Sequence, residues 1–124
     1  MNLEDFKKLA KGWLEENITA DEPHVSLRCE ENNVTLEEVK RVMLYENANL
    51  IRIVEDRPGV YKIYYRLSRK TELKVIIDLF TYNKINIRTV KKLSLKFRIG
   101  TLKQRRYEIK IMRATPGAKA WGFY

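Results

Sequence analysis

The chain has 124 residues, of which 44% are hydrophobic, with 25 Lys/Arg against 16 Asp/Glu and a single cysteine, Cys29. This length predicts one domain with its own core, and the apolar content excludes a disordered chain. No apolar run approaches the ~20 residues of a membrane-spanning helix, and one cysteine makes neither an internal disulfide nor a zinc site. The N-terminal stretch is polar and acidic, unlike a secretory signal, so we expect a cytoplasmic protein without membrane contact.

The charge is divided unevenly along the chain. Residues 1–49 hold 6 Lys/Arg and 11 Asp/Glu, a net charge of −5, whereas residues 50–124 hold 19 and 5, a net charge of +14. A basic half of this size favours a polyanionic partner, RNA or DNA. The alternatives are a solvated basic face, or one that neutralises the acidic half of a second subunit.

Three helices are predicted in the acidic half, where apolar residues recur at three- and four-residue steps. Asn2 is a suitable N-cap for the first helix. Asn32-Asn33 ends the second, because asparagine tolerates a left-handed backbone. Thr35 begins the third, and its spacing to Glu38 is that of a capping box. The predicted helices cover residues 3–17, 21–32 and 35–46.

From residue 50 the apolar pattern changes from helical to alternating. The run over residues 72–82 has β-branched and aromatic side chains on both faces, so we expect it to be the central strand of one antiparallel sheet. The strand after it is apolar on its odd-numbered side at both ends and largely basic on its even-numbered side, with a bend predicted between Thr89 and Lys92. The predicted strands cover residues 50–55, 60–67, 72–82, 85–99 and 104–113.

Together these elements predict an α+β fold. Three N-terminal helices pack on a twisted antiparallel sheet of about five strands, and the last two strands form a long C-terminal basic hairpin. We expect a single domain over residues 1–113, followed by an aromatic tail over residues 114–124.

The stretch that begins at His24 resembles a known signature. His24, three further residues and Arg28 are followed by Glu31 and then by Val34-Thr35 at the start of an acidic helix. This pattern resembles one found in small prokaryotic domains of unknown function that are grouped with the RelE/ParE and BrnT toxins, and the resemblance covers about residues 22–82. Where that signature has a basic residue and a glycine, this chain has Asn32 and Asn33.

The resemblance implies a helical layer on a twisted antiparallel sheet, with a basic surface that acts on RNA, on ribosome-bound message or on a toxin target. It also implies a cognate antitoxin as a partner. It carries over no catalytic residue, because that group has no shared catalytic triad.

Four residues are candidates for metal-independent RNA cleavage. His24 and Arg28 are one helical turn apart, so an imidazole that exchanges a proton would lie beside a guanidinium that stabilises charge on a phosphate. Tyr65 and Arg66 are of the types that position a 2′-hydroxyl and a scissile phosphate. The alternatives are a helix-start histidine with a surface arginine paired to a glutamate, and a strand tyrosine that packs in the core.

The C-terminal hairpin supplies the candidate nucleic-acid-binding residues. A two-stranded ribbon dense in Lys and Arg suits phosphate contacts in a groove, and neighbouring aromatic side chains offer stacking surfaces. The alternatives are a sheet edge protected against aggregation by its charge, and an arm that joins the two subunits of a homodimer. The candidate residues are Lys84, Arg88, Lys92, Lys96, Arg98, Arg105, Arg106 and Lys110.

The sequence contains no phosphate-binding loop, no dinucleotide fingerprint and no Cys/His metal spacing, so we expect neither a cofactor nor a bound metal. The first hypothesis is a RelE/BrnT-like toxin-type protein that binds RNA, with metal-independent cleavage left open. The alternatives are a non-enzymatic nucleic-acid-binding module, and an interaction protein that assembles through its C-terminal hairpin.

Overall fold

A computed structural model describes residues 1–94 of the chain. The chain divides into two compact units, residues 1–67 with 72–92 and residues 68–71 with 93–124, so the described elements belong almost entirely to the first. The predicted strand 104–113, the tail 114–124 and the end of the predicted strand 85–99 lie outside the described residues. The described helices and strands are α1 (Leu3–Ala10), β1 (Ile18–Ala20), α2 (His24–Glu31), α3 (Leu36–Tyr45), β2 (Leu50–Arg57), β3 (Val60–Ser68), β4 (Thr71–Thr81) and β5 (Lys84–Ser94), with short 3-10 turns at Glu15–Asn17 and Asn47–Asn49.

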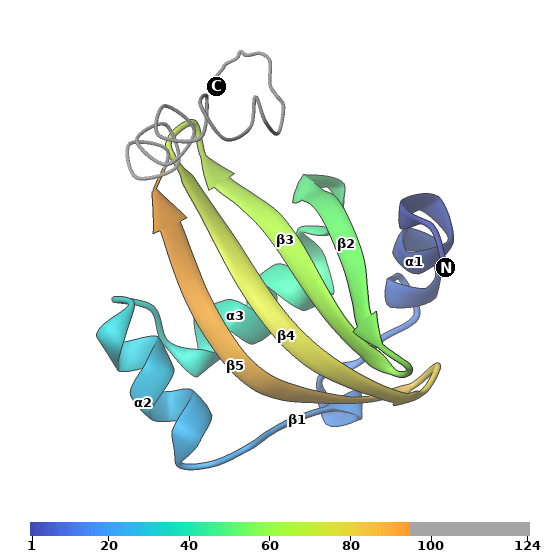
Figure 1. Ribbon diagram of the computed structural model, residues 1–124, viewed down its shortest axis with the longest axis horizontal. Coiled ribbons are helices and arrows are strands. Elements are labelled where there is room, and N and C mark those ends of the chain that lie inside the picture. Colours follow the sequence, from blue (N-terminus) through green and yellow to red (C-terminus); the bar gives the residue numbers. More distant parts are fainter. Residues whose placement is uncertain (95–124) are drawn as a thin grey trace. The chain divides into compact units, whose positions relative to one another are not determined.

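The described strands form one mixed sheet in the order β1-β5-β4-β3-β2 (Figure 1). β2 and β3 are antiparallel and meet at a turn in which Gly59 has a φ of +81°, a conformation that glycine adopts without strain. β1 pairs with β5 in parallel, with Ile18 opposite Ile85. The expectation of a purely antiparallel sheet is therefore wrong. The parallel strand lies between two predicted helices, and its three residues are too few to show a period of two.

β4 lies at the centre of the sheet, with two strands on either side, as the sequence predicts for residues 72–82. Leu73, Val75 and Ile77 are buried, whereas Lys74 and Ile76, which point to the other face, are partly exposed. Only one face of this strand is therefore fully covered by described residues, as in a sheet with a single helical layer.

α1 begins as predicted but ends seven residues early. The Asn2 side chain accepts a hydrogen bond of 2.8 Å from the backbone N–H of Asp5 at its start. After Ala10 the backbone tightens, with the N–H of Gly12 and of Trp13 each bonding three residues back. The prediction of a helix to residue 17 is wrong because tertiary contacts hold Trp13 outside a helical course. Its ring packs edge-on against Phe6, with the ring centroids 5.5 Å apart. Its indole N–H donates to the carbonyl of Tyr82, in the turn between β4 and β5, at 2.8 Å.

α2 ends in a Schellman motif, which explains the two asparagines after it. Asn33 has a φ of 57°, the left-handed conformation expected from the sequence. The N–H of Val34 donates to the carbonyl of Cys29 at 3.0 Å, and the N–H of Asn33 donates to the carbonyl of Glu30 at 3.2 Å. Two of the carbonyls that the helix end leaves open are thereby paired.

α3 begins with the predicted capping box. The Thr35 hydroxyl accepts from the N–H of Glu38 at 3.0 Å, and the Glu38 carboxylate accepts from the N–H of Thr35 at 2.8 Å. Both partners satisfy backbone groups that a helix start leaves open, so this local pattern sets where α3 begins.

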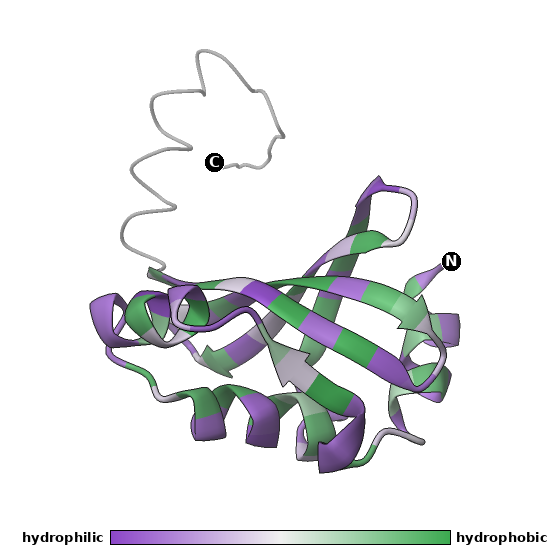
Figure 2. Cartoon of the chain, turned by 90° about the horizontal axis from the view of Figure 1, so that it is seen from below, coloured by the Kyte–Doolittle hydropathy of each residue, from purple (hydrophilic) through white to green (hydrophobic). Residues whose placement is uncertain are grey.

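Side chains of all three helices and of the sheet form one hydrophobic core. Phe6 of α1, Val25 of α2 and Met43 of α3 are fully buried in the same cluster as Val75 and Ile77 of β4. Figure 1 shows α3 crossing behind the sheet, and Figure 2 shows hydrophobic and hydrophilic residues alternating along the strands. Within residues 1–94, no helix covers the face of the sheet that is turned toward the viewer in Figure 1.

Candidate nucleic-acid interface

The face of the sheet without a described helix, called here the open face, begins at the β2–β3 pair. Residues directly opposite each other in an antiparallel pair point to the same face. Arg52 is opposite Tyr64, and Val54 is opposite Lys62. The Arg52 guanidinium lies over the Tyr64 ring, 3.9 Å from its centroid, in a cation–π contact.

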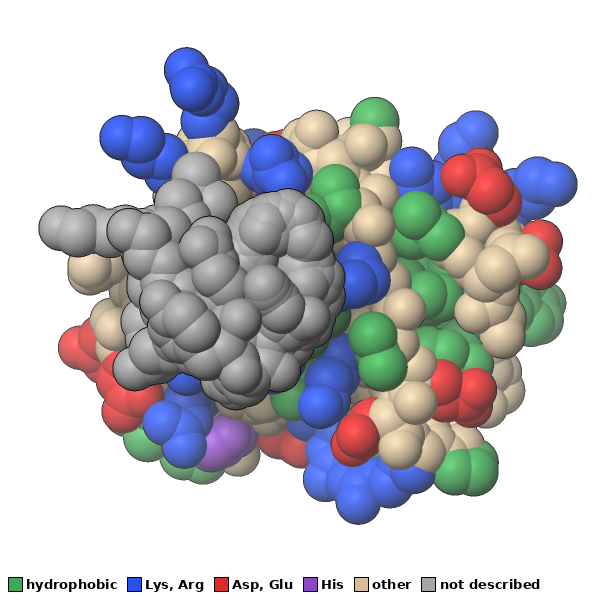
Figure 3. Space-filling view, turned by 45° about the horizontal axis from the view of Figure 1, so that its top comes forward, with side chains coloured by type: hydrophobic (Ala, Val, Ile, Leu, Met, Phe, Trp, Pro, Cys, Tyr) green, Lys and Arg blue, Asp and Glu red, His purple; other side chains and the backbone are tan. Residues whose placement is uncertain are grey.

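The open face continues across β4 and β5, because every second side chain of each strand points to it. Arg66 of β3 pairs with Glu72 of β4 at 3.6 Å, and Arg88 of β5 pairs with Asp78 of β4 at 3.6 Å. The Phe80 ring is 59% exposed near the end of β4. Figure 3 shows Lys and Arg side chains among apolar ones on the side of the molecule that it presents. The open face comprises Arg52, Val54, Lys62, Tyr64, Arg66, Glu72, Lys74, Ile76, Asp78, Phe80, Asn86 and Arg88.

The layers of the described protein differ in charge. Residues 1–49, which contain all three helices, carry a net charge of −5, and residues 50–94, which form β2 to β5, hold 11 Lys/Arg and 4 Asp/Glu, a net charge of +7. The sequence predicts this asymmetry, and the fold converts it into a basic sheet on an acidic helical layer. Such a surface attracts polyanions at long range.

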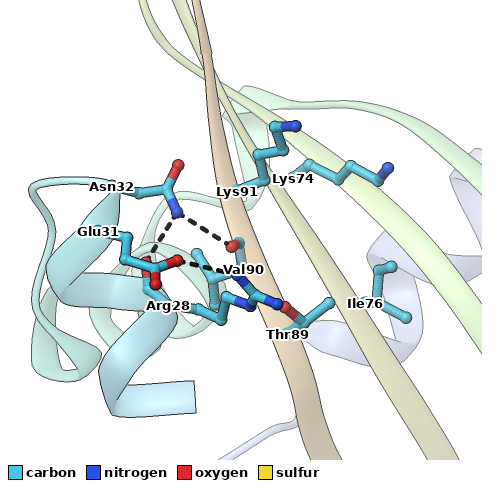
Figure 4. A pocket seen from close by; sticks show the side chains of 8 residues that line it. All are labelled: Arg28, Glu31, Asn32, Lys74, Ile76, Thr89, Val90 and Lys91. Atoms are coloured by element: carbon cyan, nitrogen blue, oxygen red, sulfur yellow. Dashed lines mark hydrogen bonds and ion pairs between the residues drawn. The ribbon is translucent and has the colours of Figure 1, made fainter. Parts of the chain in front are cut away.

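A cavity of about 480 Å³ lies where α2 meets the outer edge of β5 (Figure 4). Its side chains come from three elements that are far apart in the sequence. Arg28 extends from α2 toward Thr89 of β5, with its guanidinium 2.9 Å from the Glu31 carboxylate. We call this cavity the edge pocket; it is lined by Arg28, Glu31, Asn32, Lys74, Ile76, Thr89, Val90 and Lys91.

Asn32 holds α2 against β5. β1 pairs only with residues 85–87 of β5, so the outer edge of β5 beyond them has no neighbouring strand among the described residues. There the Asn32 side chain accepts from the N–H of Lys92 at 2.9 Å and donates to the carbonyl of Val90 at 3.5 Å. The amide thus imitates the peptide group of an adjacent strand and fixes one wall of the edge pocket.

The structure does not bring the four predicted catalytic residues together. His24 and Arg28 are both exposed on α2, as their spacing predicts, and Arg28 lines the edge pocket. Arg66 is exposed on the open face, whereas its neighbour Tyr65 points to the opposite face and is fully buried. Burial raises the pKa of the Tyr65 hydroxyl because it disfavours the phenolate. An RNA phosphate on the open face does not reach this hydroxyl.

The predicted binding residues are only partly described. Lys84 is exposed at the start of β5, and Arg88 lies half-buried on the open face. Lys92 lies on the helical side, because the buried positions of β5 change from odd-numbered Ile87 to even-numbered Val90. The single basic side predicted for this strand is therefore interrupted where the sequence indicates a bend. Lys96, Arg98, Arg105, Arg106 and Lys110 lie outside the described residues.

Several residues of the interface were not among the predicted site residues: Arg52, Tyr64, Lys74, Asn32 and Lys91. The period-two pattern of β3 and β4 carries a signal for some of them, because Lys62, Tyr64 and Lys74 alternate with buried aliphatic or aromatic residues. No local signal brings Arg52 over Tyr64, because that contact depends on a register that contains an irregularity between Leu50 and Arg52.

Two further findings concern the described residues alone. Within residues 1–94, no group of three or more His, Cys, Asp or Glu side chains is arranged to hold a metal ion. The same residues include no helix with the length and apolar character needed to cross a membrane.

Comparison with protein-family models, with curated proteins and with solved structures found no match to this chain. The resemblance to the RelE/ParE and BrnT group therefore stays a prediction. What is shown for residues 1–94 is an α+β fold with three α-helices and a five-stranded mixed sheet.

Proposed function

We propose that this chain binds single-stranded nucleic acid across the open face of its sheet. The observation that carries the proposal is the Arg52–Tyr64 pair on a basic sheet face over which no helix of residues 1–94 lies. An exposed guanidinium plane and aromatic rings offer stacking surfaces to unpaired bases. The surrounding cations supply the phosphate contacts on which affinity for nucleic acid depends.

The charge pairs on the open face are consistent with this role. The pairs of Arg66 with Glu72 and of Arg88 with Asp78 are both 3.6 Å long, and each arginine side chain remains more than a third exposed. The partner carboxylates are mostly buried, since the Glu72 side chain is 3% exposed and that of Asp78 is 19% exposed. Each arginine therefore stays beside its carboxylate and offers its exposed N–H groups to a phosphate. Lys62 of β3 and Lys74 of β4 are two further cations of the open face.

Cleavage of the bound strand is a separate step. The toxin-type hypothesis needs a proton acceptor or donor beside a scissile phosphate, and the four candidate residues lie on α2, in the core and on the open face. This dispersal favours binding over cleavage as the function that we propose. A dimerisation arm formed by the predicted hairpin stays a prediction, because most of that hairpin lies outside the described residues.

The test measures fluorescence anisotropy of labelled dodecamers of single-stranded RNA, single-stranded DNA and duplex RNA. We expect the single strands to bind more tightly than the duplex, with an affinity that falls steeply as salt increases. Tyr64→Ala and Arg52→Gln should each weaken binding about tenfold, whereas Lys8→Gln, which removes a cation from exposed α1, should leave it nearly unchanged.

A flat salt dependence, or equal losses for Lys8→Gln and Arg52→Gln, would contradict binding through the open face. Primer extension on a message incubated with the protein adds the test for cleavage. Discrete breaks that disappear in His24→Ala would restore the toxin-type hypothesis. An intact message together with tight binding would support the binding module.

A further inference from the structure

The edge pocket gathers positive charge from three separate elements. Arg28 of α2, Lys74 of β4 and Lys91 of β5 line it, and Glu31 is the sole acid among its described lining residues. The net charge of the lining is therefore +2. Three cations around one cavity make the edge pocket a site suited to an anion.

The walls of the pocket are held by contacts that do not need a ligand. Asn32 bonds the end of α2 to β5, and Glu31 holds the Arg28 guanidinium at 2.9 Å. A helix C-terminus ordinarily repels anions through its free carbonyls. Here the Arg28 carbonyl accepts from the Asn32 side chain at 2.7 Å, and the carbonyls of Cys29 and Glu30 accept within the Schellman motif. Three of the last four carbonyls of α2 are therefore paired, which weakens the negative potential at this helix end.

We infer that the edge pocket binds the terminal phosphomonoester of the nucleic acid strand that lies on the open face, an inference that rests on the proposed function. A phosphomonoester near neutral pH carries close to two negative charges, which matches the +2 lining. An internal phosphodiester carries one. The Thr89 hydroxyl is a further donor, and Ile76 and Val90 supply apolar surface for the adjoining sugar and base.

The position of the pocket favours a strand end over a strand interior. A strand that crosses the sheet from β2 toward β5 meets α2 beyond the edge of β5 (Figures 1 and 4). The volume of about 480 Å³ lies within the range of ~300–1,000 Å³ that small-ligand pockets occupy. The edge pocket therefore has room for one terminal nucleotide beside α2, and the nucleic acid strand can end there.

The experiment compares three unlabelled dodecamers of one sequence, with a 5′-phosphate, with a 3′-phosphate and with neither, as competitors for a single internally labelled strand. We expect one of the two phosphorylated ends to bind about tenfold more tightly than the unphosphorylated strand, as charge-assisted hydrogen bonds to one added dianion would give. Which end gains affinity gives the polarity of the strand on the sheet.

Substitutions distinguish the contribution of the edge pocket to binding from that of the open face. Arg28→Gln and Lys91→Gln should bring the ratio of affinities for the phosphorylated and unphosphorylated strands close to one. The matched control Lys62→Gln, on the open face away from the pocket, should weaken all three strands and leave that ratio unchanged. Glu31→Gln should raise the ratio, because it removes the one opposing charge. Circular dichroism confirms that each variant is folded.

The two proposals fail in different ways. Equal affinities for the three strands in the unmodified protein would overturn the pocket inference and leave the proposed function standing. A second experiment tests the edge pocket without a nucleic acid strand: adenosine monophosphate and adenosine are each titrated into the protein while its backbone amide NMR shifts are recorded. Shifts at Thr89 and Lys91 with the monophosphate alone, in a protein that binds none of the dodecamers, would overturn binding across the open face. They would also overturn a strand end as the ligand of the edge pocket, while showing that the pocket binds a phosphomonoester.

Discussion

The substitution Tyr65→Phe tests whether Tyr65 acts in catalysis or only packs in the core. The hydroxyl of Tyr65 is fully buried and has no hydrogen-bond partner among the described residues. The ring lies opposite Leu50 within the core. A buried polar group left without a partner costs about 1–3 kcal/mol of folding free energy. Because the Phe ring fills the same space, the variant should be more stable than the original chain by about 1 kcal/mol.

The measurement is urea unfolding followed by circular dichroism. With an m value of about 1–3 kcal/mol/M, the midpoint should rise by ~0.3–1 M. The matched control is Tyr64→Phe, the next residue along β3, whose side chain lies on the partly exposed open face. Its midpoint should change little, because surface substitutions usually alter stability by less than about 0.5 kcal/mol.

A pH series tests the same hydroxyl. Burial raises the pKa of Tyr65 in the folded protein above its ordinary value of about 10. Above that value the unfolded chain loses the tyrosine proton while the folded chain keeps it. Stability therefore falls as pH rises, by about 1.4 kcal/mol per pH unit from this group, and Tyr65→Phe should lack that component. A variant that is less stable than the original by 1 kcal/mol or more, with an unchanged pH profile, would refute the reasoning.

Three further substitutions test the contacts that shape the fold, each by urea unfolding. Because Asn33 has a left-handed φ of 57°, Asn33→Gly should keep or raise the stability and Asn33→Ala should lower it by about 1 kcal/mol. Equal stabilities of the two variants would contradict the claim that the left-handed conformation selects the residue at this position. Thr35→Ala should cost about 1 kcal/mol through loss of the capping box, and much of that loss should already appear in Glu38→Ala. Trp13→Phe should cost at least about 1 kcal/mol, because the carbonyl of Tyr82 loses the indole N–H; no loss would mean that this contact does not hold the end of α1.

The local features of the fold follow from short patterns in the sequence. The capping box at Thr35 and Glu38 and the left-handed Asn33 need only their immediate neighbours, and both are found as predicted. The alternation of β3 and β4 reveals which side chains enter the core, because a strand places every second residue on the same face. These patterns were sufficient to predict the α+β class and the central position of β4.

The long-range features could not be found in this way. The end of α1 depends on a contact of Trp13 with a turn that lies 69 residues further along the chain. The parallel pairing of β1 depends on the edge of β5. The opposite sides of Arg88 and Lys92 follow from the change from odd-numbered to even-numbered buried positions within β5. None of these is visible in a window of neighbouring residues.

The candidate site shows the same division. The concentration of basic residues in the second half of the chain follows from the amino-acid sequence, since charge is a property of composition. Which of these residues share a surface depends on how the strands pair and pack. A side chain's face is set by strand register, so Arg52 meets Tyr64 while Tyr65 turns into the core. The edge pocket exists because α2, β4 and β5 meet there, and that meeting is a property of packing rather than of any one segment.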